Sequence, residues 1–107
     1  MSAWRDVAPL AEFPAGSVRQ VDLPDGTPVA VFHVGGRFFA IEDVCSHEAE
    51  TLSYGTVEGE EVVCPLHGAR FSLATGAALS PPAYEPVATF PVRIDGGIVQ
   101  VDGAGHD

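Results

Sequence analysis

The sequence predicts an all-β protein with antiparallel strands. Three observations support this prediction: short runs rich in β-branched and aromatic residues recur along the chain, twelve glycines and nine prolines separate them, and several separating segments are turn sequences. One segment, residues 8–13, could form a helical turn, which Pro14 would end because proline removes a backbone donor. No other helix is expected.

The β-branched runs give the expected strands. In chain order these strands are residues 18–23, 29–34, 37–42, 61–63, 87–92 and 98–101. Three turn sequences lie beside them: Pro24-Asp25-Gly26, Gly35-Gly36 and Asp95-Gly96-Gly97. Each combines residues that preset a turn or tolerate a positive φ. Each is therefore expected to close a hairpin.

The length and the irregular segments suggest how the chain is organised. A chain of 107 residues can build one hydrophobic core, so a single domain spanning residues 1–107 is expected. Residues 43–55 and 64–70 are longer than hairpin turns and lack strand alternation, which is typical of functional loops on a rigid sheet. Residues 80–86 contain three prolines and should form a stiff cover. Residues 103–107 are expected to be a flexible tail.

The composition excludes some classes of partner. Fifteen acidic and five basic residues give a formal net charge of −10, which repels nucleic acid and anionic membrane surfaces. A protein partner with a basic docking surface is favoured instead. The N-terminal segment has no pattern of a secretory signal, and no run approaches the roughly 18 apolar residues of a membrane span. A cytoplasmic location is therefore expected.

Both cysteines and two of the four histidines form two short groups, Cys45 with His47 and Cys64 with His67. Each group lies in one of the two long irregular segments and offers one thiolate and one imidazole. A disulfide, a redox pair and a metal site all remain open from cysteine count alone. The usual zinc pattern pairs cysteine with cysteine and histidine with histidine, whereas here the pairs are mixed. A dinuclear cluster would explain the mixed pairs, because each loop could then supply its cysteine to one metal and its histidine to the other.

These groups resemble the small Rieske-type ferredoxins that serve bacterial aromatic-ring-hydroxylating dioxygenases. In Rieske 2Fe-2S centres two histidines replace two cysteines on one of the irons. The resemblance rests on CSH, on CPLHG and on the sequence RFSLATGAALSPPAYEPVATFPVRIDGGIVQVD that follows, and it extends from a strand at Trp4 to the last hairpin. It implies a Rieske fold of stacked antiparallel sheets. Loops 43–55 and 64–70 would form a small cluster-binding subdomain, and the proline segment would lie over it.

The resemblance also implies a role for each ligand. Cys45 and Cys64 would bind the buried iron of one 2Fe-2S cluster, and His47 and His67 the outer iron. High-potential respiratory relatives place a serine and a tyrosine where this chain has Ala69 and Phe71. Without those hydroxyl donors, a reduction potential near the low end of the Rieske range, about −150 mV, is predicted. The potential should also fall at alkaline pH, because the added electron raises the pKa of the bound histidines.

The implied function is that of a soluble one-electron carrier between a ferredoxin reductase and a terminal oxygenase, without enzyme activity of its own. Two alternatives remain: a Rieske-type small subunit of a nitrite reductase or another oxidoreductase complex, and a structural zinc-binding module.

Of the other histidines, His33 lies in an apolar strand pattern and is expected to pack there, and His106 should be exposed. Gly68 is expected to allow a sharp turn after His67. The acidic residues Glu58, Glu60 and Glu61 are either a docking patch or solvated hairpin charges.

Overall fold

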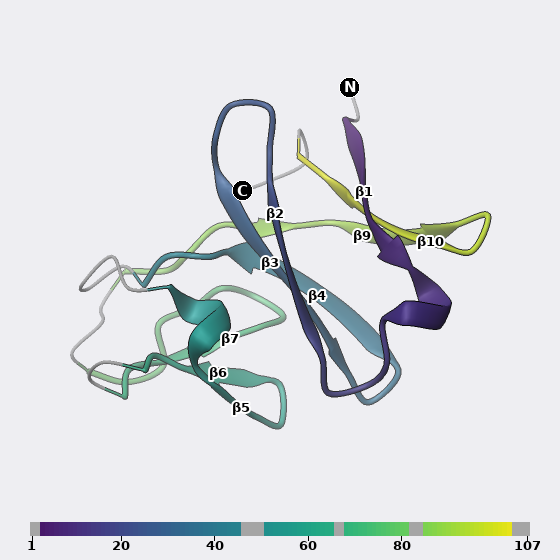
Figure 1. The fold of residues 1–107 in the computed structure, drawn as a ribbon. Helices are drawn as coiled ribbons and strands as arrows, with labels where there is room; N and C mark the ends of the chain where they lie inside the picture. The colour runs from purple at the N-terminus through teal and green to yellow at the C-terminus, as the bar shows by residue number, and fades with distance from the viewer. Residues whose placement is uncertain (1–2, 46–50, 66–67, 82–84, 104–107) are drawn as a thin grey trace.

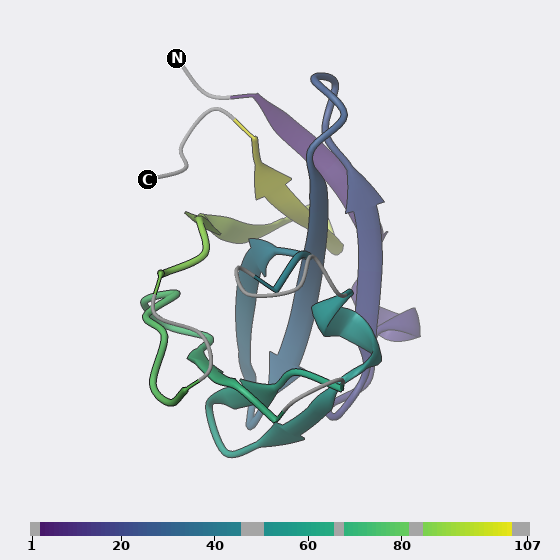
Figure 2. The same ribbon diagram turned by 90° about the vertical axis from the view of Figure 1, so that its left-hand side faces the viewer.

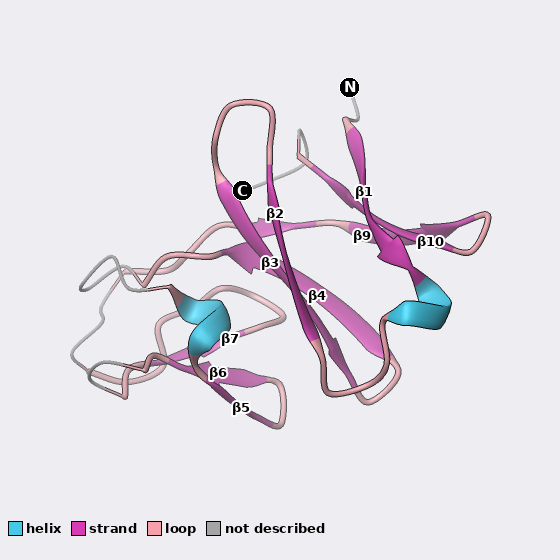
Figure 3. Cartoon of the chain, viewed as in Figure 1, coloured by secondary structure: helices cyan, strands magenta, loops and turns pink. Residues whose placement is uncertain are grey.

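The computed structural model describes residues 3–45, 51–65, 68–81 and 85–103 and confirms the all-β prediction (Figure 1). Strands dominate these residues, and the two helices are single 3-10 turns (Figure 3). In chain order the elements are β1 (Trp4–Pro9), η1 (Leu10–Glu12), β2 (Val18–Asp22), β3 (Pro28–Val34), β4 (Arg37–Glu42), η2 (Leu52–Tyr54), β5 (Thr56–Glu58), β6 (Glu61–Val63), β7 (Arg70–Ser72), β8 (Thr89–Phe90), β9 (Val92–Asp95) and β10 (Ile98–Asp102). Neither helix of the described residues is long and apolar enough to cross a membrane.

The strands form three antiparallel sheets. The first has the order β1-β10-β9, the second β2-β3-β4-β8 and the third β5-β6-β7. The first sheet joins strands from the two ends of the described chain, with Trp4 opposite Asp102. The third sheet is built only from consecutive strands and extends from one side of the other two (Figures 1 and 2).

The second sheet is central and is covered on both faces. Along β3, Val29 and Val31 belong to an apolar cluster shared with Val99 and Val101 of the first sheet. Their neighbours Ala30 and Phe32 belong to a second cluster, which contains residues of the third sheet. This division follows from strand geometry, since successive side chains point to opposite faces. An almost continuously apolar β3 is therefore what a strand buried on both sides requires.

The three predicted hairpins are confirmed. Strands β2 and β3 are joined around Gly26, β3 and β4 around Gly35 and Gly36, and β9 and β10 around Gly96 and Gly97. All five glycines have positive φ values between 57° and 90°, a region that costs side-chain-bearing residues free energy. The predicted helical turn is also present as η1, which is followed by Phe13 and then Pro14.

Two predictions about the strands need correction, and so does the expectation of a single helical turn, because η2 is present besides η1. The predicted strand 87–92 is two strands, β8 in the second sheet and β9 in the first, because Pro91 between them has no N–H to donate. The β-branched pattern also missed β5 and β7, which complete the third sheet. At the start of the tail predicted over residues 103–107, the N–H of Gly103 donates to Ala3 O at 3.2 Å, and the flexibility of the tail stays a prediction. The rest of that tail, with His106, lies outside the described residues.

Candidate metal centre

The two cysteines come from different strands but share one apolar cluster. Cys45 lies three residues beyond the end of β4, and Cys64 directly follows β6. Their exposed fractions are 1% and 2%, and both side chains belong to the cluster between the second and third sheets. Both are thiols and not halves of a disulfide. The fold thus brings the only two thiols of the sequence into one buried environment, without joining them.

The two predicted histidine ligands, His47 and His67, lie outside the described residues. Within the described part of the chain, no group of three or more His, Cys, Asp or Glu side chains is placed to hold a metal ion. The structure therefore brings together the cysteine half of the predicted ligand set, and the histidine half stays a prediction.

The base of the first loop is closed by a buried carboxylate. Asp43 is 3% exposed, and its Oδ1 accepts a hydrogen bond of 2.6 Å from the N–H of Ser53 on the far side of the loop. Its backbone N–H donates to Pro28 O at 2.9 Å, which fixes the start of the loop to β3. The sequence interpretation missed Asp43. An acidic residue two positions before Cys45 was visible, but its partner Ser53 is brought close only by folding.

The second loop turns back tightly after Cys64. The N–H of Cys64 donates to Ala69 O at 2.7 Å, and the N–H of Gly68 donates to Cys64 O at 3.1 Å. Gly68 has a φ of 74°, a conformation that favours glycine and that either a sharp turn after His67 or an ordinary turn would use. These hydrogen bonds fix the backbone on both sides of residues 66 and 67, which lie outside the described residues.

A close backbone approach holds the two loops together. Gly55 ends the first loop, and a Cβ atom at this position would lie 2.0 Å from Val63 O and 3.1 Å from Leu52 O. Only glycine allows the backbone to come this close. The next residue, Thr56, pairs with Val63 at the start of the third sheet. Because Val63 directly precedes Cys64, the end of one loop sets the position of the other.

The segment with three prolines is anchored at both ends, and its first end is bonded to Arg70 at the end of the second loop. Ser80 Oγ accepts a hydrogen bond of 3.0 Å from the N–H of Arg70, and the N–H of Leu79 donates to Arg70 O at 2.7 Å. At the other end, the N–H of Val87 donates to Gly76 O at 2.9 Å. Residues 82–84 lie outside the described residues. These anchors fix the ends of the segment, and its covering role stays a prediction.

The acidic residues of the β5–β6 hairpin are compensated locally. Arg70 pairs with Glu58 at 3.0 Å and with Glu61 at 3.4 Å, and Arg37 pairs with Glu60 at 2.9 Å. The hydrogen bond that the Arg70 guanidinium donates to Glu58 Oε1 is the main cause that raises the pKa of Arg70 above its ordinary value. All of these side chains are substantially exposed, so each pair stabilises the fold only slightly. The pairing favours the interpretation as solvated hairpin charges.

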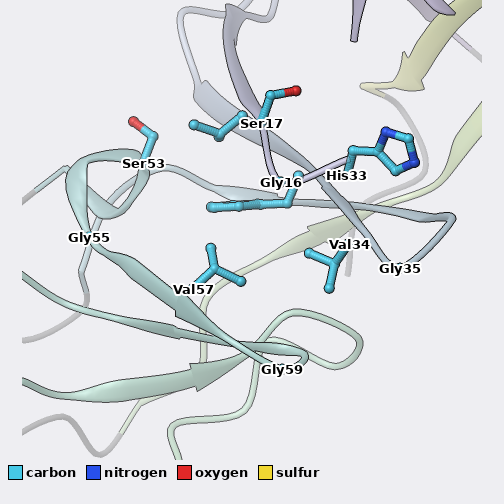
Figure 4. A pocket seen from close by; sticks show the side chains of 11 residues that line it. Gly16, Ser17, His33, Val34, Gly35, Ser53, Gly55, Val57 and Gly59 are labelled. Atoms are coloured by element: carbon cyan, nitrogen blue, oxygen red, sulfur yellow. The ribbon is translucent and has the colours of Figure 1, made fainter. Parts of the chain in front are cut away.

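A hollow of about 440 Å³ lies between the second and third sheets, and neither cysteine is among its lining residues (Figure 4). Val18, Val34 and Val57 contribute aliphatic walls, and the one titratable side chain among its lining residues is His33. His33 Nδ1 is 2.8 Å from Phe13 O, and its ring stacks on Phe38 with centroids 4.2 Å apart. This packing confirms that His33 is a structural side chain.

Comparison with known proteins assigns the fold to a family. The family model described as "Rieske [2Fe-2S] domain" matches residues 3–91. The chain is 43% identical over 95 residues to the 3-phenylpropionate/cinnamic acid dioxygenase ferredoxin subunit of Shigella flexneri serotype 5b, covering 88% of each chain.

Solved structures agree with this assignment. The ferredoxin fold in a structure described as a complex of reduced oxygenase and oxidized ferredoxin in carbazole 1,9a-dioxygenase matches with a TM-score of 0.88 and 37% identity, over 94% of this chain and 93% of that one. A putative NADH-dependent nitrite reductase small subunit from Mycobacterium tuberculosis matches with a TM-score of 0.82 and 26% identity, over 95% and 96% of the two chains.

The described residues fit the cofactor of this family, one Rieske-type 2Fe-2S cluster. Such a cluster takes two thiolates on one iron, and the structure supplies two buried thiols on adjacent loops. Thiols also exclude the disulfide that the spacing had left open. Ala69 and Phe71, where respiratory relatives carry hydroxyls, are both buried and offer no side-chain donor. On fold, thiol placement and sequence match together, the chain belongs to the Rieske 2Fe-2S domain family.

Proposed function

We propose that the chain is a one-electron carrier that passes electrons from a reductase to a terminal oxygenase of the aromatic-ring-hydroxylating type, in the cytoplasm. The observation that supports this most strongly is the similarity, over nearly the full length of both chains, to a ferredoxin solved together with its oxygenase. The named relatives are ferredoxin subunits, so the chain is proposed to have no enzyme activity of its own. All of residues 1–107 would then serve as a single carrier domain.

The proposed ligands are Cys45 and Cys64 for the inner iron and His47 and His67 for the outer iron. When bound, the cluster supplies one-electron oxidation and reduction. Burial of both thiols supports this division, because it leaves the sulfur side away from solvent. The protein would exclude water from that side, and the loops that carry the histidines would face the partner.

The proposed partners are a ferredoxin reductase and a terminal oxygenase, each with a basic docking surface. The net charge of −10 supports the choice of basic surfaces, because opposite charge accelerates encounter. The three hairpin glutamates are poor candidates for that contact, since each already pairs with an arginine of this chain. Acidic residues elsewhere would therefore carry most of the attraction.

Component replacement tests the proposal. In a reconstituted 3-phenylpropionate dioxygenase system, the chain replaces the ferredoxin subunit, and product formation is measured against its concentration. A carrier should raise product formation in proportion to its concentration until another component becomes limiting. Product formation that is the same with and without the chain would contradict the assignment. The C64S variant, which lacks one proposed ligand, serves as the inactive control.

A fixed subunit of a nitrite reductase is the second candidate, favoured by the similarity to the Mycobacterium tuberculosis chain. The two candidates differ in how tightly the chain is held. A fixed subunit should co-purify with a catalytic chain from its native cells and stay bound through size-exclusion chromatography. A shuttling carrier should elute alone and should exchange between partners during turnover.

A further inference from the structure

Asp43 is a buried carboxylate that a ligand role does not explain. It has an exposed fraction of 3% and lies two residues before Cys45. Its Oδ1 accepts from the N–H of Ser53 at 2.6 Å, and its Oδ2 accepts from Ser53 Oγ at 2.7 Å. Gln20 Nε2 lies 3.3 Å from the same Oδ2 and donates to Ser53 Oγ at 2.7 Å. Three side chains from different parts of the sequence thus form one closed hydrogen-bond network.

The network joins three elements at the base of the first loop. Gln20 belongs to β2, Ser53 belongs to η2, and the backbone of Asp43 is bonded to Pro28 at the start of β3. Residues 43 and 53 bracket Cys45, so their hydrogen bonds hold the two ends of the loop at a fixed separation. A loop closed in this way has fewer backbone conformations, and the position of Cys45 is better defined.

The network also supplies hydrogen-bond donors to a carboxylate at a buried site, where charge is costly. Burying a carboxylate is unfavourable unless hydrogen-bond donors compensate it, and here both oxygens have them. A charge at a buried site acts on its neighbours through a lower effective dielectric than a charge at the surface. A buried carboxylate close along the chain to Cys45 therefore opposes the arrival of an electron there.

We propose that Asp43 is a positioning residue for electron transfer, which holds the first ligand loop through Ser53 and Gln20 and lowers the reduction potential by its charge. This inference rests on the proposed carrier function. The reduction potential would then depend on the network of Asp43, Ser53 and Gln20 as well as on the thiol ligands.

Two substitutions separate the charge of Asp43 from its hydrogen bonds. Asp43→Asn keeps the shape of the side chain and removes the charge, so the reduction equilibrium should shift about tenfold towards the reduced form, or about 59 mV for one electron. Ser53→Ala keeps the charge and removes the hydroxyl, so the potential should not rise. Iron should leave Ser53→Ala severalfold faster than wild type in the presence of a chelator. Glu42→Gln, at the neighbouring partly exposed carboxylate, is the matched control and should shift the potential much less.

The potentials are measured by spectroelectrochemical titration of each holoprotein, and iron release by absorbance during chelation. An unchanged potential in Asp43→Asn, or an equal rise in Asp43→Asn and Glu42→Gln, would overturn the role of the buried charge. If Asp43→Asn does not fold, the positioning role is still overturned when Ser53→Ala releases its iron at the same rate as the wild type. A wild-type protein that binds no cluster would instead refute the proposed function, so the two failures are distinguishable.

Discussion

Cys64 is a proposed ligand and His33 is a packed side chain, and substitution distinguishes these two roles. Cys64→Ser replaces a buried thiol with a harder oxygen ligand, so the purified protein should lose its visible absorption and most of its iron. His33→Asn should keep both, because His33 is bonded to Phe13 O and stacked on Phe38. Absorption spectra and iron analysis provide the measurement. A colourless His33→Asn protein that is still folded by circular dichroism would contradict the ligand assignment.

Gly55 gives a second prediction for a single residue, because it has no room for a side chain. A Cβ atom there would lie 2.0 Å from a backbone oxygen, so Gly55→Ala should lower the free energy of unfolding by about 3 kcal/mol. Gly59 in the next turn has a φ of 61° and nothing within 4 Å of an added Cβ. Gly59→Ala should therefore cost only about 1 kcal/mol. Equal losses of stability in urea unfolding would show that the loops are not held by this contact.

The hairpins and the loops were predictable from the sequence to different degrees. Strands β3 and β4 are apolar over most of their length and are joined by Gly35-Gly36, so pattern and turn chemistry both indicated them. Strand β5 has only exposed residues and no apolar alternation, so nothing in its sequence distinguishes it from a loop. Strand β7 is three residues long and gains its partners only when the second loop has formed. The division between β8 and β9 was indicated in the sequence by Pro91, which lies between the two strands.

The candidate site shows a similar division. The cysteine and histidine spacing is local in sequence, and it led to the family and to the four proposed ligands. The network around Asp43 depends on Gln20 and Ser53, which are 23 and 10 residues away and meet Asp43 only in the folded chain. The close approach at Gly55 depends on the pairing of β5 with β6 in the same way. The spacing of cysteines and histidines in the sequence therefore indicates the proposed ligands. The contacts that position the ligand loops can be identified only from the folded structure.

The Ser80 hydroxyl supplies one of the two hydrogen bonds that anchor the first end of the proline segment. Ser80→Ala leaves the part-buried N–H of Arg70 without its acceptor, which should cost about 1 kcal/mol and accelerate hydrogen exchange at that amide. Ser17→Ala is the control, because Ser17 Oγ donates to Pro14 O at an exposed position. NMR-detected exchange measures both variants. Unchanged exchange at Arg70 would show that Ser80 does not anchor the segment.

The reduction potential depends on the ligand set, on the hydrogen bonds to the cluster and on the net charge of the protein. It should lie near the low end of the Rieske range, about −150 mV, because Ala69 and Phe71 offer no hydroxyl donors. It should fall as the pH becomes alkaline, because reduction raises the pKa of the histidines and so takes up protons there. Spectroelectrochemical titration over a pH series measures both effects. A potential above about +100 mV, or one that is flat with alkaline pH, would contradict the assignment.

Mössbauer spectroscopy of the oxidised, iron-57-labelled protein tests the proposed ligand set most directly. The spectrum should show two iron sites of equal area with different parameters, one bound by the thiolates of Cys45 and Cys64 and the other by imidazole nitrogens. Two equivalent irons, or labelled protein that retains no iron after anaerobic reconstitution, would contradict the proposed ligand set.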